Sequence, residues 1–171
     1  MTDGGPYYAF NNANVIGWKC IIHAFDNTLI NVDGNSGVLA YNETQVTAER
    51  DCRVFAHEKS KIVSLKNSRV SAHGQAQLIA KDKSLIVLHD ETTCESYDCS
   101  SVELFGRSKA ICYDSSISFC YRQSSVKCYN ESTAYVYEAD SVEGKDNSVI
   151  FLYCDPANIS LNISQNCSVR P

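Results

Sequence analysis

The fold of this chain is decided by the stretch Ser100–Asn130, which reads SSVELFGR, SKAICYDS, SISFCYRQ and SSVKCYN when it is divided into groups of eight. Each group begins with a serine, continues with alternating small or apolar residues, reaches an aromatic residue and ends on polar residues. Alternation with a period of two is typical of a β-strand that is buried on one face. Each group therefore predicts one short strand followed by a tight bend.

The same register extends from Cys20 to Asp155 without an insertion, which gives 17 octads. The first column of the octad is Ser or Thr in 13 of them and the third is Val, Ile or Leu in 13, so both columns face a constant environment. The fifth column is mostly Ala, Ser, Cys or Gly. Residue types that recur at a fixed spacing indicate coils that stack in register. We therefore predict an all-β, single-domain parallel β-solenoid of octapeptide repeats.

The number of octads in each coil follows from the sixth column, which holds the residue just before the bend. In alternate octads this residue is aromatic or His in all nine cases, whereas the intervening octads mix charged, apolar and aromatic residues. A 16-residue grouping separates these two classes, and a 24-residue grouping mixes them. We therefore predict a two-sided coil of 16 residues, with a three-sided β-helix of 24 residues per coil as the alternative.

Both ends of the chain depart from the octad pattern. Residues 1–19 are expected to form an N-terminal cap with a degenerate first octad, in which Tyr7, Tyr8 and Phe10 cover the open first coil. Residues 20–155 form the solenoid, and residues 156–171 form a C-terminal cap. In this last segment the alternation changes parity after Pro156, so we expect a strand that turns away from the solenoid.

The odd-numbered positions of the octads should face solvent, and they form two different faces. The first face comprises the octads that begin at Cys20, Ser36 and every sixteenth residue onward; 16 of its 27 outward residues are aliphatic or aromatic, and three are acidic or basic. The second face comprises the remaining octads and carries nine charged residues among 24. The first face is thus the candidate interaction surface.

We predict that the first face is buried in a partner. Its area is about 700 Å² if nine coils are spaced about 4.8 Å apart, which approaches one partner's share of a standard protein interface. A second copy of the chain, in a homodimer, is the first expectation; a host protein or the C-terminal tail are the alternatives. The predicted interface residues are Phe25, Leu39, Tyr41, Phe55, His57, His73, His89, Phe105, Phe119, Tyr121, Tyr135, Tyr137, Phe151 and Tyr153.

No catalytic site is predicted, and neither is a cofactor or a metal site. The serines belong to the repeat, and His57, His73 and His89 stack on successive coils with no nucleophile beside them. If these histidines lie in an interface, their protonation below about pH 6 should weaken association. Seven of the nine cysteines fall on inward or turn-proximal columns, so we expect reduced thiols packed as small apolar groups.

The charge and hydropathy of the chain restrict its partners and location. A net charge of −5 with both signs interspersed makes nucleic acid an unlikely partner, and no apolar run is long enough to span a membrane. The N-terminal residues MTDGGPYYAF do not read as a secretory signal, so we expect a cytoplasmic protein.

The octads SSVKCYN (residues 124–130) and NSRVSAHG (residues 67–74) resemble the repeat of octapeptide β-solenoid proteins found in phage, prophage and gut-bacterial genomes. The resemblance covers about residues 20–155. It implies a stable, non-enzymatic scaffold or protein-binding module, located in the cytoplasm of a bacterial host if the protein is phage-encoded. It also implies two alternatives: an inhibitor of a host defence effector, of the anti-CRISPR or DNA-mimic type, and a structural component of a virion or other particle.

Overall fold

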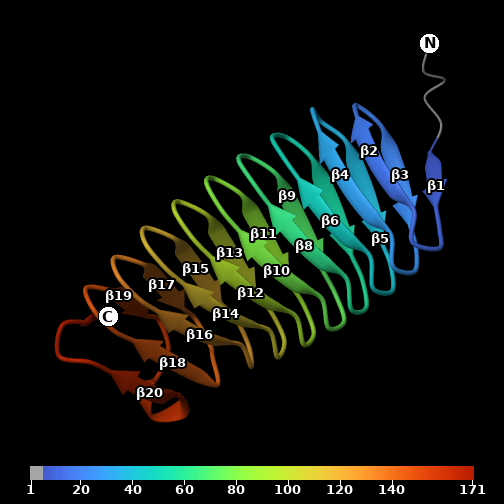
Figure 1. Ribbon diagram of the computed structural model, residues 1–171. Helices are drawn as coiled ribbons and strands as arrows, with labels where there is room; N and C mark the ends of the chain where they lie inside the picture. The colour runs from blue at the N-terminus through green and yellow to red at the C-terminus, as the bar shows by residue number, and fades with distance from the viewer. Residues whose placement is uncertain (1–5) are drawn as a thin grey trace.

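The computed structural model describes residues 6–171; the first five residues of the predicted N-terminal cap lie outside this range. Two parallel β-sheets lie back to back and extend along one axis, with the chain passing from one sheet to the other at every bend (Figure 1). Each coil contributes one strand to each sheet. The predicted two-sided solenoid of 16-residue coils is therefore confirmed, and the three-sided alternative is wrong.

The two sheets are named here by their strand numbers. The odd sheet contains, in spatial order, β1 (Tyr7–Ala9), β3 (Ile21–Ala24), β5 (Gly37–Ala40), β7 (Arg53–Ala56), β9 (Arg69–Ala72), β11 (Leu85–Leu88), β13 (Ser101–Leu104), β15 (Ile117–Cys120), β17 (Thr133–Val136), β19 (Val149–Leu152) and β21 (Ser168–Arg170). The even sheet contains β2 (Asn14–Trp18), β4 (Leu29–Asp33), β6 (Gln45–Ala48), β8 (Lys61–Ser64), β10 (Gln77–Ala80), β12 (Thr93–Ser96), β14 (Lys109–Cys112), β16 (Ser125–Cys128), β18 (Ser141–Gly144) and β20 (Ser160–Ile163).

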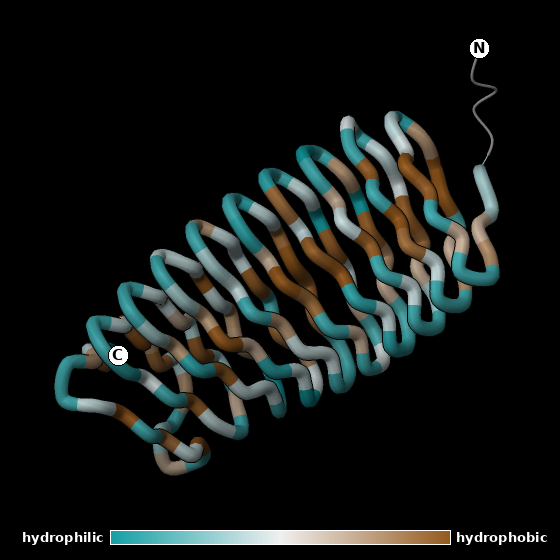
Figure 2. The backbone as a smooth tube through the Cα atoms, in the orientation of Figure 1, coloured by the Kyte–Doolittle hydropathy of each residue, from teal (hydrophilic) through white to brown (hydrophobic). Residues whose placement is uncertain are grey.

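Neighbouring strands pair in parallel with like residues side by side. From β3 to β19 each residue pairs with the one 16 positions later, as in the row Val38, Val54 and Val70. The first, third and fifth columns point into the space between the sheets, where nearly all of them are buried. Figure 2 shows the resulting apolar bands along the strands. The narrow core explains why β-branched residues alternate with Ala, Ser and Cys.

The bends explain the Ser/Thr column and the polar residues before it. The hydroxyl of Ser68 donates a hydrogen bond of 2.8 Å to the carbonyl of Leu65, three residues earlier, and Thr44 does the same to Tyr41 at 2.7 Å. The residue after each of these two carbonyls has a positive φ, 60° at Lys66 and 58° at Asn42, and Asp82 at the equivalent position of its bend has 59°. Asp and Asn tolerate this left-handed conformation better than most side chains. The octad thus ends on the residues that the bend requires.

The N-terminal coil is one residue shorter than the others, since Tyr7 pairs with Ile22 rather than with residue 23. Tyr7 therefore continues an inward column and is the aromatic residue that covers part of the open end. Tyr8 and Phe10 are directed outward instead: Tyr8 lies against His23, and Phe10 stacks on the ring of Phe25. The expectation that all three aromatic residues cover the core is wrong for these two.

The C-terminal segment extends the solenoid by one coil. A 3-10 turn, η1 (Pro156–Asn158), begins after Asp155, whose Oδ1 accepts a hydrogen bond of 3.0 Å from the N–H of Ala157. This turn adds three residues, so Ser141 pairs with Ser160, 19 positions later. The change in parity follows directly, but the expected strand that turns away is wrong: β20 and β21 join the two sheets. Within residues 6–171, no helix is long and apolar enough to cross a membrane.

Candidate protein-interaction surface

The nine residues of the sixth column of the first face, together with Phe10, form a continuous stack of ten rings along the odd sheet, called here the aromatic ladder. Ring centroids of successive members lie between 4.5 and 5.5 Å apart, with the ring planes nearly parallel. This spacing follows from the distance between neighbouring strands of a sheet, because each ring occupies the same position in its coil. The ladder comprises Phe10, Phe25, Tyr41, His57, His73, His89, Phe105, Tyr121, Tyr137 and Tyr153.

The rings of the ladder cover one another's flat faces and present their edges to solvent. The seven rings from Phe25 to Tyr121 are mostly buried as a result, whereas Phe10 at the N-terminal end is 49% exposed and Tyr137 and Tyr153 at the C-terminal end are 42% and 53% exposed. Sequence reasoning placed all of these residues except Phe10 on one face correctly but did not foresee that they would bury each other. The apolar surface that remains for a partner therefore lies on the aliphatic residues beside the ladder and on its two ends.

A second stack lies beside the ladder on the same sheet. Phe119, Tyr135 and Phe151 follow one another at centroid distances of 5.1 and 5.0 Å, and the guanidinium of Arg170 lies 5.8 Å from the centroid of Phe151. Tyr135 also lies 6.5 Å from the ring of Tyr153, so the two stacks adjoin. All fourteen residues predicted for the interface thus lie on the first face, which the odd sheet carries.

The charged residues of the first face lie in a hollow near its middle. Arg53 and Arg69 are neighbours in register on β7 and β9, and Glu103 lies two strands further along, on β13. The hollow has a volume of about 410 Å³ and extends over β7, β9, β11 and β13. None of the three charged residues takes part in an ion pair recorded for residues 6–171.

The three stacked histidines form the middle of the aromatic ladder. Their centroids are 5.5 Å apart for His57 and His73, and 4.5 Å apart for His73 and His89. Partial burial, together with the charge of His73, lowers the pKa of both His57 and His89. Because the rings are parallel, their nitrogen lone pairs cannot converge on one ion; across the described chain, no group of three or more His, Cys, Asp or Glu side chains is placed to hold a metal.

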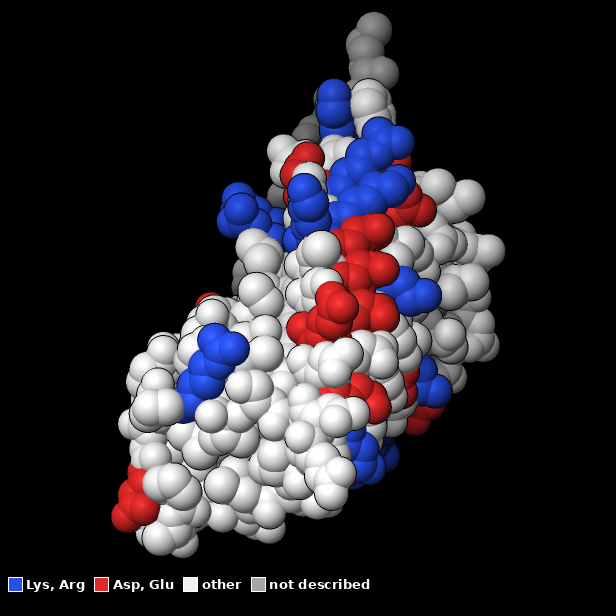
Figure 3. Space-filling model, turned by 90° about the vertical axis from the view of Figure 1, so that its left-hand side faces the viewer, with Lys and Arg blue, Asp and Glu red and all other residues white. Residues whose placement is uncertain are grey.

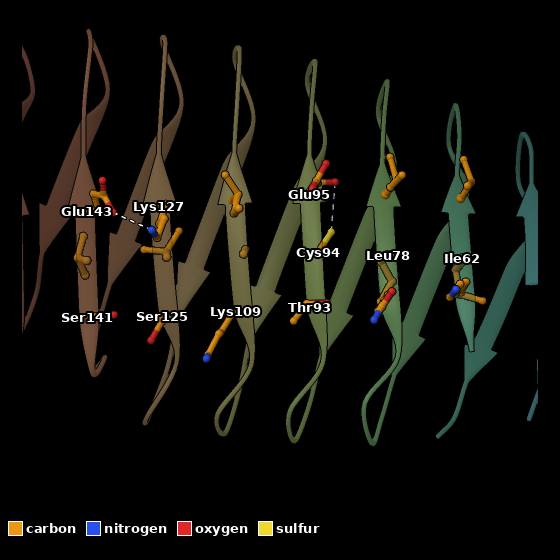
Figure 4. A pocket seen from close by; sticks show the side chains of 18 of the residues that line it. Ile62, Leu78, Thr93, Cys94, Glu95, Lys109, Ser125, Lys127, Ser141 and Glu143 are labelled. Carbon is orange, nitrogen blue, oxygen red and sulfur yellow. Dashed lines mark hydrogen bonds and ion pairs between the residues drawn. The ribbon is translucent and has the colours of Figure 1, made fainter. Parts of the chain in front are cut away.

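The second face contains a larger hollow that the sequence analysis did not single out. A groove of about 860 Å³ runs along the even sheet from β4 to β20, with the strand segments around Ile62, Leu78 and Cys94 lining it (Figure 4). Small side chains such as Ser125 and Ser141 on one row leave this space open. The sequence carries little signal for it, because the second octad position of this face is small only at Thr93, Ser125 and Ser141.

Two of the five charged residues that line this groove, Lys127 and Glu143, form an ion pair with each other. Glu143 lies 3.0 Å from the Nζ of Lys127 and 2.6 Å from that of Lys145, and these two ammonium groups lower the pKa of its carboxyl group (Figure 4). Tyr97 donates a hydrogen bond of 2.8 Å to Glu95, which raises the pKa of the phenol to about 12.

The groove is bordered by three stacked tyrosines, which are distinct from the aromatic ladder. Tyr97, Tyr113 and Tyr129 lie at centroid distances of 4.9 and 5.3 Å. The ammonium groups of Lys81 and Lys145 lie 5.6 and 5.5 Å from the first and last ring. Both ends of this stack are thus in contact with cations, a stabilising arrangement for aromatic faces.

The edges of the molecule carry most of the remaining charge. Figure 3 shows basic and acidic side chains gathered in a stripe along the molecule, beside a broad area with few charges. Several carboxylates at the bends accept a hydrogen bond from the backbone of the preceding coil, as Asp90 does from the N–H of Gly74 at 3.0 Å. These carboxylates therefore stabilise the bends.

The fold and the surface together define a two-sheet parallel β-solenoid with one predominantly apolar face and one grooved, mixed-charge face. No family model, no curated protein and no solved structure matched the chain in the comparisons.

Proposed function

We propose that the protein is a non-enzymatic scaffold that acts as a protein-binding module through its first face, and that a second copy of the chain is its principal partner. One observation carries this proposal: the outward side of the odd sheet combines two aromatic stacks with exposed aliphatic residues and only four charged residues, Arg53, Arg69, Glu103 and Arg170. Phe55 and Leu85, for example, are 49% and 45% exposed. Contiguous apolar patches of this extent are typical of interaction sites.

A pair of substitutions tests whether the first face mediates association. Phe119→Glu combined with Tyr135→Glu places two charges within the second stack, so we expect a dimer of the unchanged chain to become a monomer in sedimentation velocity. Ile79→Glu, on the second face, is the matched control because Ile79 is also an exposed apolar residue. Circular dichroism checks that each variant is folded. An unchanged dimer in the double variant would contradict the proposal.

The groove on the second face favours a second partner that binds independently of the first face. A dimer through the odd sheet leaves the groove open, because the two sheets face in opposite directions. A phage-encoded inhibitor, as the octapeptide resemblance implies, could use this groove to bind a host effector while it is dimeric. Capture of a host protein that is lost with Ile79→Glu and retained with Phe119→Glu would support this second candidate.

A further inference from the structure

The first face has the size and the shape that a two-fold dimer requires. Nine full strands, β3 to β19, spaced about 4.8 Å apart and about five residues wide, provide roughly 700 Å², close to the share of about 800 Å² that each partner buries in a standard interface. A two-fold axis that brings two copies of one sheet face to face lies in the plane between them. The two solenoid axes then run either parallel or antiparallel.

The charges of the first face distinguish these two arrangements. Arg53 and Arg69 lie on the N-terminal side of β11, and Glu103 lies on its C-terminal side. In a parallel dimer the two-fold axis runs along the solenoid and reverses the strand direction. An axis over the fourth octad position then places Glu103 opposite Glu103 of the second copy, and Arg53 and Arg69 opposite His57 and His73. Like charges facing each other in an interface are unfavourable by several kcal/mol. The parallel arrangement is therefore disfavoured.

An antiparallel dimer reverses the order of the coils and brings opposite charges together. With the two-fold axis on β11, strand β9 of one copy faces β13 of the other. Arg69 then lies opposite Ser101 of the second copy, and Glu103 lies opposite Ser71. Arg69 and Glu103 of the two copies are thus diagonal neighbours, two residues apart along the strand, and the long arginine side chain can span this offset. Symmetry repeats the pair on the other side of the axis. The side chains on β11 itself, Leu85 and Val87, line the hollow of the first face and lie opposite their own equivalents in the apolar centre of the interface. A desolvated apolar centre flanked by charge pairs is the usual anatomy of a stable interface.

The position of the axis also follows from the surface. Strand β11 is the middle strand of β3 to β19, so an axis there gives the largest overlap. It also places Arg53, on β7, opposite the strand of Phe119, where the guanidinium can lie over an aromatic ring. Moving the axis by half a coil, between β9 and β11, would leave Arg69 opposite Leu85 and bury a charge without a partner.

We infer that the first face binds a second copy of the chain in an antiparallel, two-fold arrangement centred on β11, with Arg69 of each copy paired with Glu103 of the other. This inference rests on the proposed function and specifies its geometry. It predicts a symmetric dimer in which the N-terminal coils of one copy cover the C-terminal coils of the other, including the exposed end of the aromatic ladder.

Charge reversal tests the predicted pair. Arg69→Glu and Glu103→Arg should each raise the dimer dissociation constant about tenfold or more, since each places like charges beside one another across the interface. The variant that carries both substitutions should regain most of the affinity, because the pair is restored with reversed sign. Lys109→Glu on the second face is the control and should leave the constant unchanged. Two weakened single variants without recovery in the double variant would contradict the pairing.

Cross-linking tests the orientation in a Cys99→Ser background, which removes the exposed thiol. Ile21 and Val149 are outward residues on β3 and β19. A short bis-maleimide should cross-link a mixture of Ile21→Cys and Val149→Cys chains, and neither variant alone. Cross-linking of Ile21→Cys with Phe25→Cys chains instead would show a parallel dimer, which overturns the inference but retains the proposed function. An unmodified chain that is monomeric at micromolar concentration would overturn both.

Discussion

The Oδ2 atom of Asp98 accepts a hydrogen bond of 3.0 Å from the backbone N–H of Asp82, the equivalent residue one coil earlier. Both residues have a left-handed backbone, with φ of 57° and 59°. The same bond recurs at other bends, where Asp82 accepts from Lys66 and Asn42 accepts from Asp26. Consecutive bends are therefore linked by side chains as well as by the sheets.

Substitution of Asp98 should separate the contribution of this bond from that of the backbone conformation. Asp98→Asn keeps an acceptor and a tolerated left-handed conformation, so we expect little change in the free energy of unfolding. Asp98→Gly removes only the acceptor and should be destabilising by about 1 kcal/mol. Asp98→Ala loses the acceptor and adds the strain of a left-handed alanine, about 1–2 kcal/mol more. Urea denaturation checks this order, and equal values for Gly and Ala would contradict it.

Shortening a side chain in the core should be strongly destabilising because the two sheets leave no freedom to collapse. Ile86 is 1% exposed on β11, in the row with Val70 and Val102. We expect Ile86→Ala to lower the free energy of unfolding by about 2–5 kcal/mol and Ile86→Val by about 1 kcal/mol. Chemical denaturation measures both. A loss below about 1 kcal/mol for the alanine variant would mean that the core is less tightly packed than described.

Acidification should weaken the fold through the stacked histidines. The pKa of both His57 and His89 is lowered in the folded chain, mainly by burial and also by His73, while Glu58 and Asp90 oppose the shift. The unfolded chain, with histidine pKa values near 6.5, therefore binds more protons just below that pH. The free energy of unfolding should fall as the pH drops from about 6.5, and association through the first face should weaken in the same range.

The control for this pH dependence replaces the three histidines by the residue found elsewhere in the ladder. His57→Tyr, His73→Tyr and His89→Tyr together should retain the ring stack, since Tyr41 and Tyr121 occupy equivalent positions. Thermal melts at about pH 7.5 and pH 5.5 should then differ less than those of the unchanged chain. Equal differences in the two proteins would assign the effect to other groups.

Only one of the nine cysteines should react rapidly with a chromogenic thiol reagent in the folded protein. Cys99 is exposed, whereas the other eight are buried or half-buried, and burial raises the pKa of the Cys94 thiol. The thiolate is the reactive form, so raised pKa values slow the reaction further. We expect one fast thiol, nine after unfolding, and no fast thiol in Cys99→Ser. Several thiols reacting at the rate of Cys99 would contradict the packed core.

The repeat made the backbone predictable from the sequence. In a parallel in-register stack, all residues of one column have the same environment. Val38, Val54 and Val70, which occupy the same position in successive coils, therefore indicate three times that this position is buried. The C-terminal end was less predictable because η1 inserts three residues. This insertion moves the inward-facing positions from even to odd residue numbers, although β20 still pairs with β18 in parallel. A shift in alternation cannot by itself distinguish a strand that leaves the sheet from one that rejoins it.

For the surface, the sequence predicted which residues point outward and on which of the two faces they lie, but not how their side chains pack. The first face could be assigned from Phe105 and Tyr121, but the mutual burial of their rings depends on side-chain rotamers. The groove on the second face depends on the difference in size between neighbouring rows, such as Ser125 beside Lys127. The burial of the rings and the depth of the groove both depend on how side chains of neighbouring rows pack against each other. The residue types of a single octad position do not contain this information.

The offset of 16 residues between paired strands from β3 to β19 also limits how this chain can change in length. Deleting residues 61–76 would remove β8 and β9, join Ser60 to Gln77 in the correct column and leave every later side chain on its original face. Deleting only residues 61–68 would transfer each later strand to the opposite sheet, so the aromatic ladder would continue into the row of Asp33 and Glu49. Gain or loss of whole coils is therefore the one change in repeat number that preserves two chemically distinct surfaces.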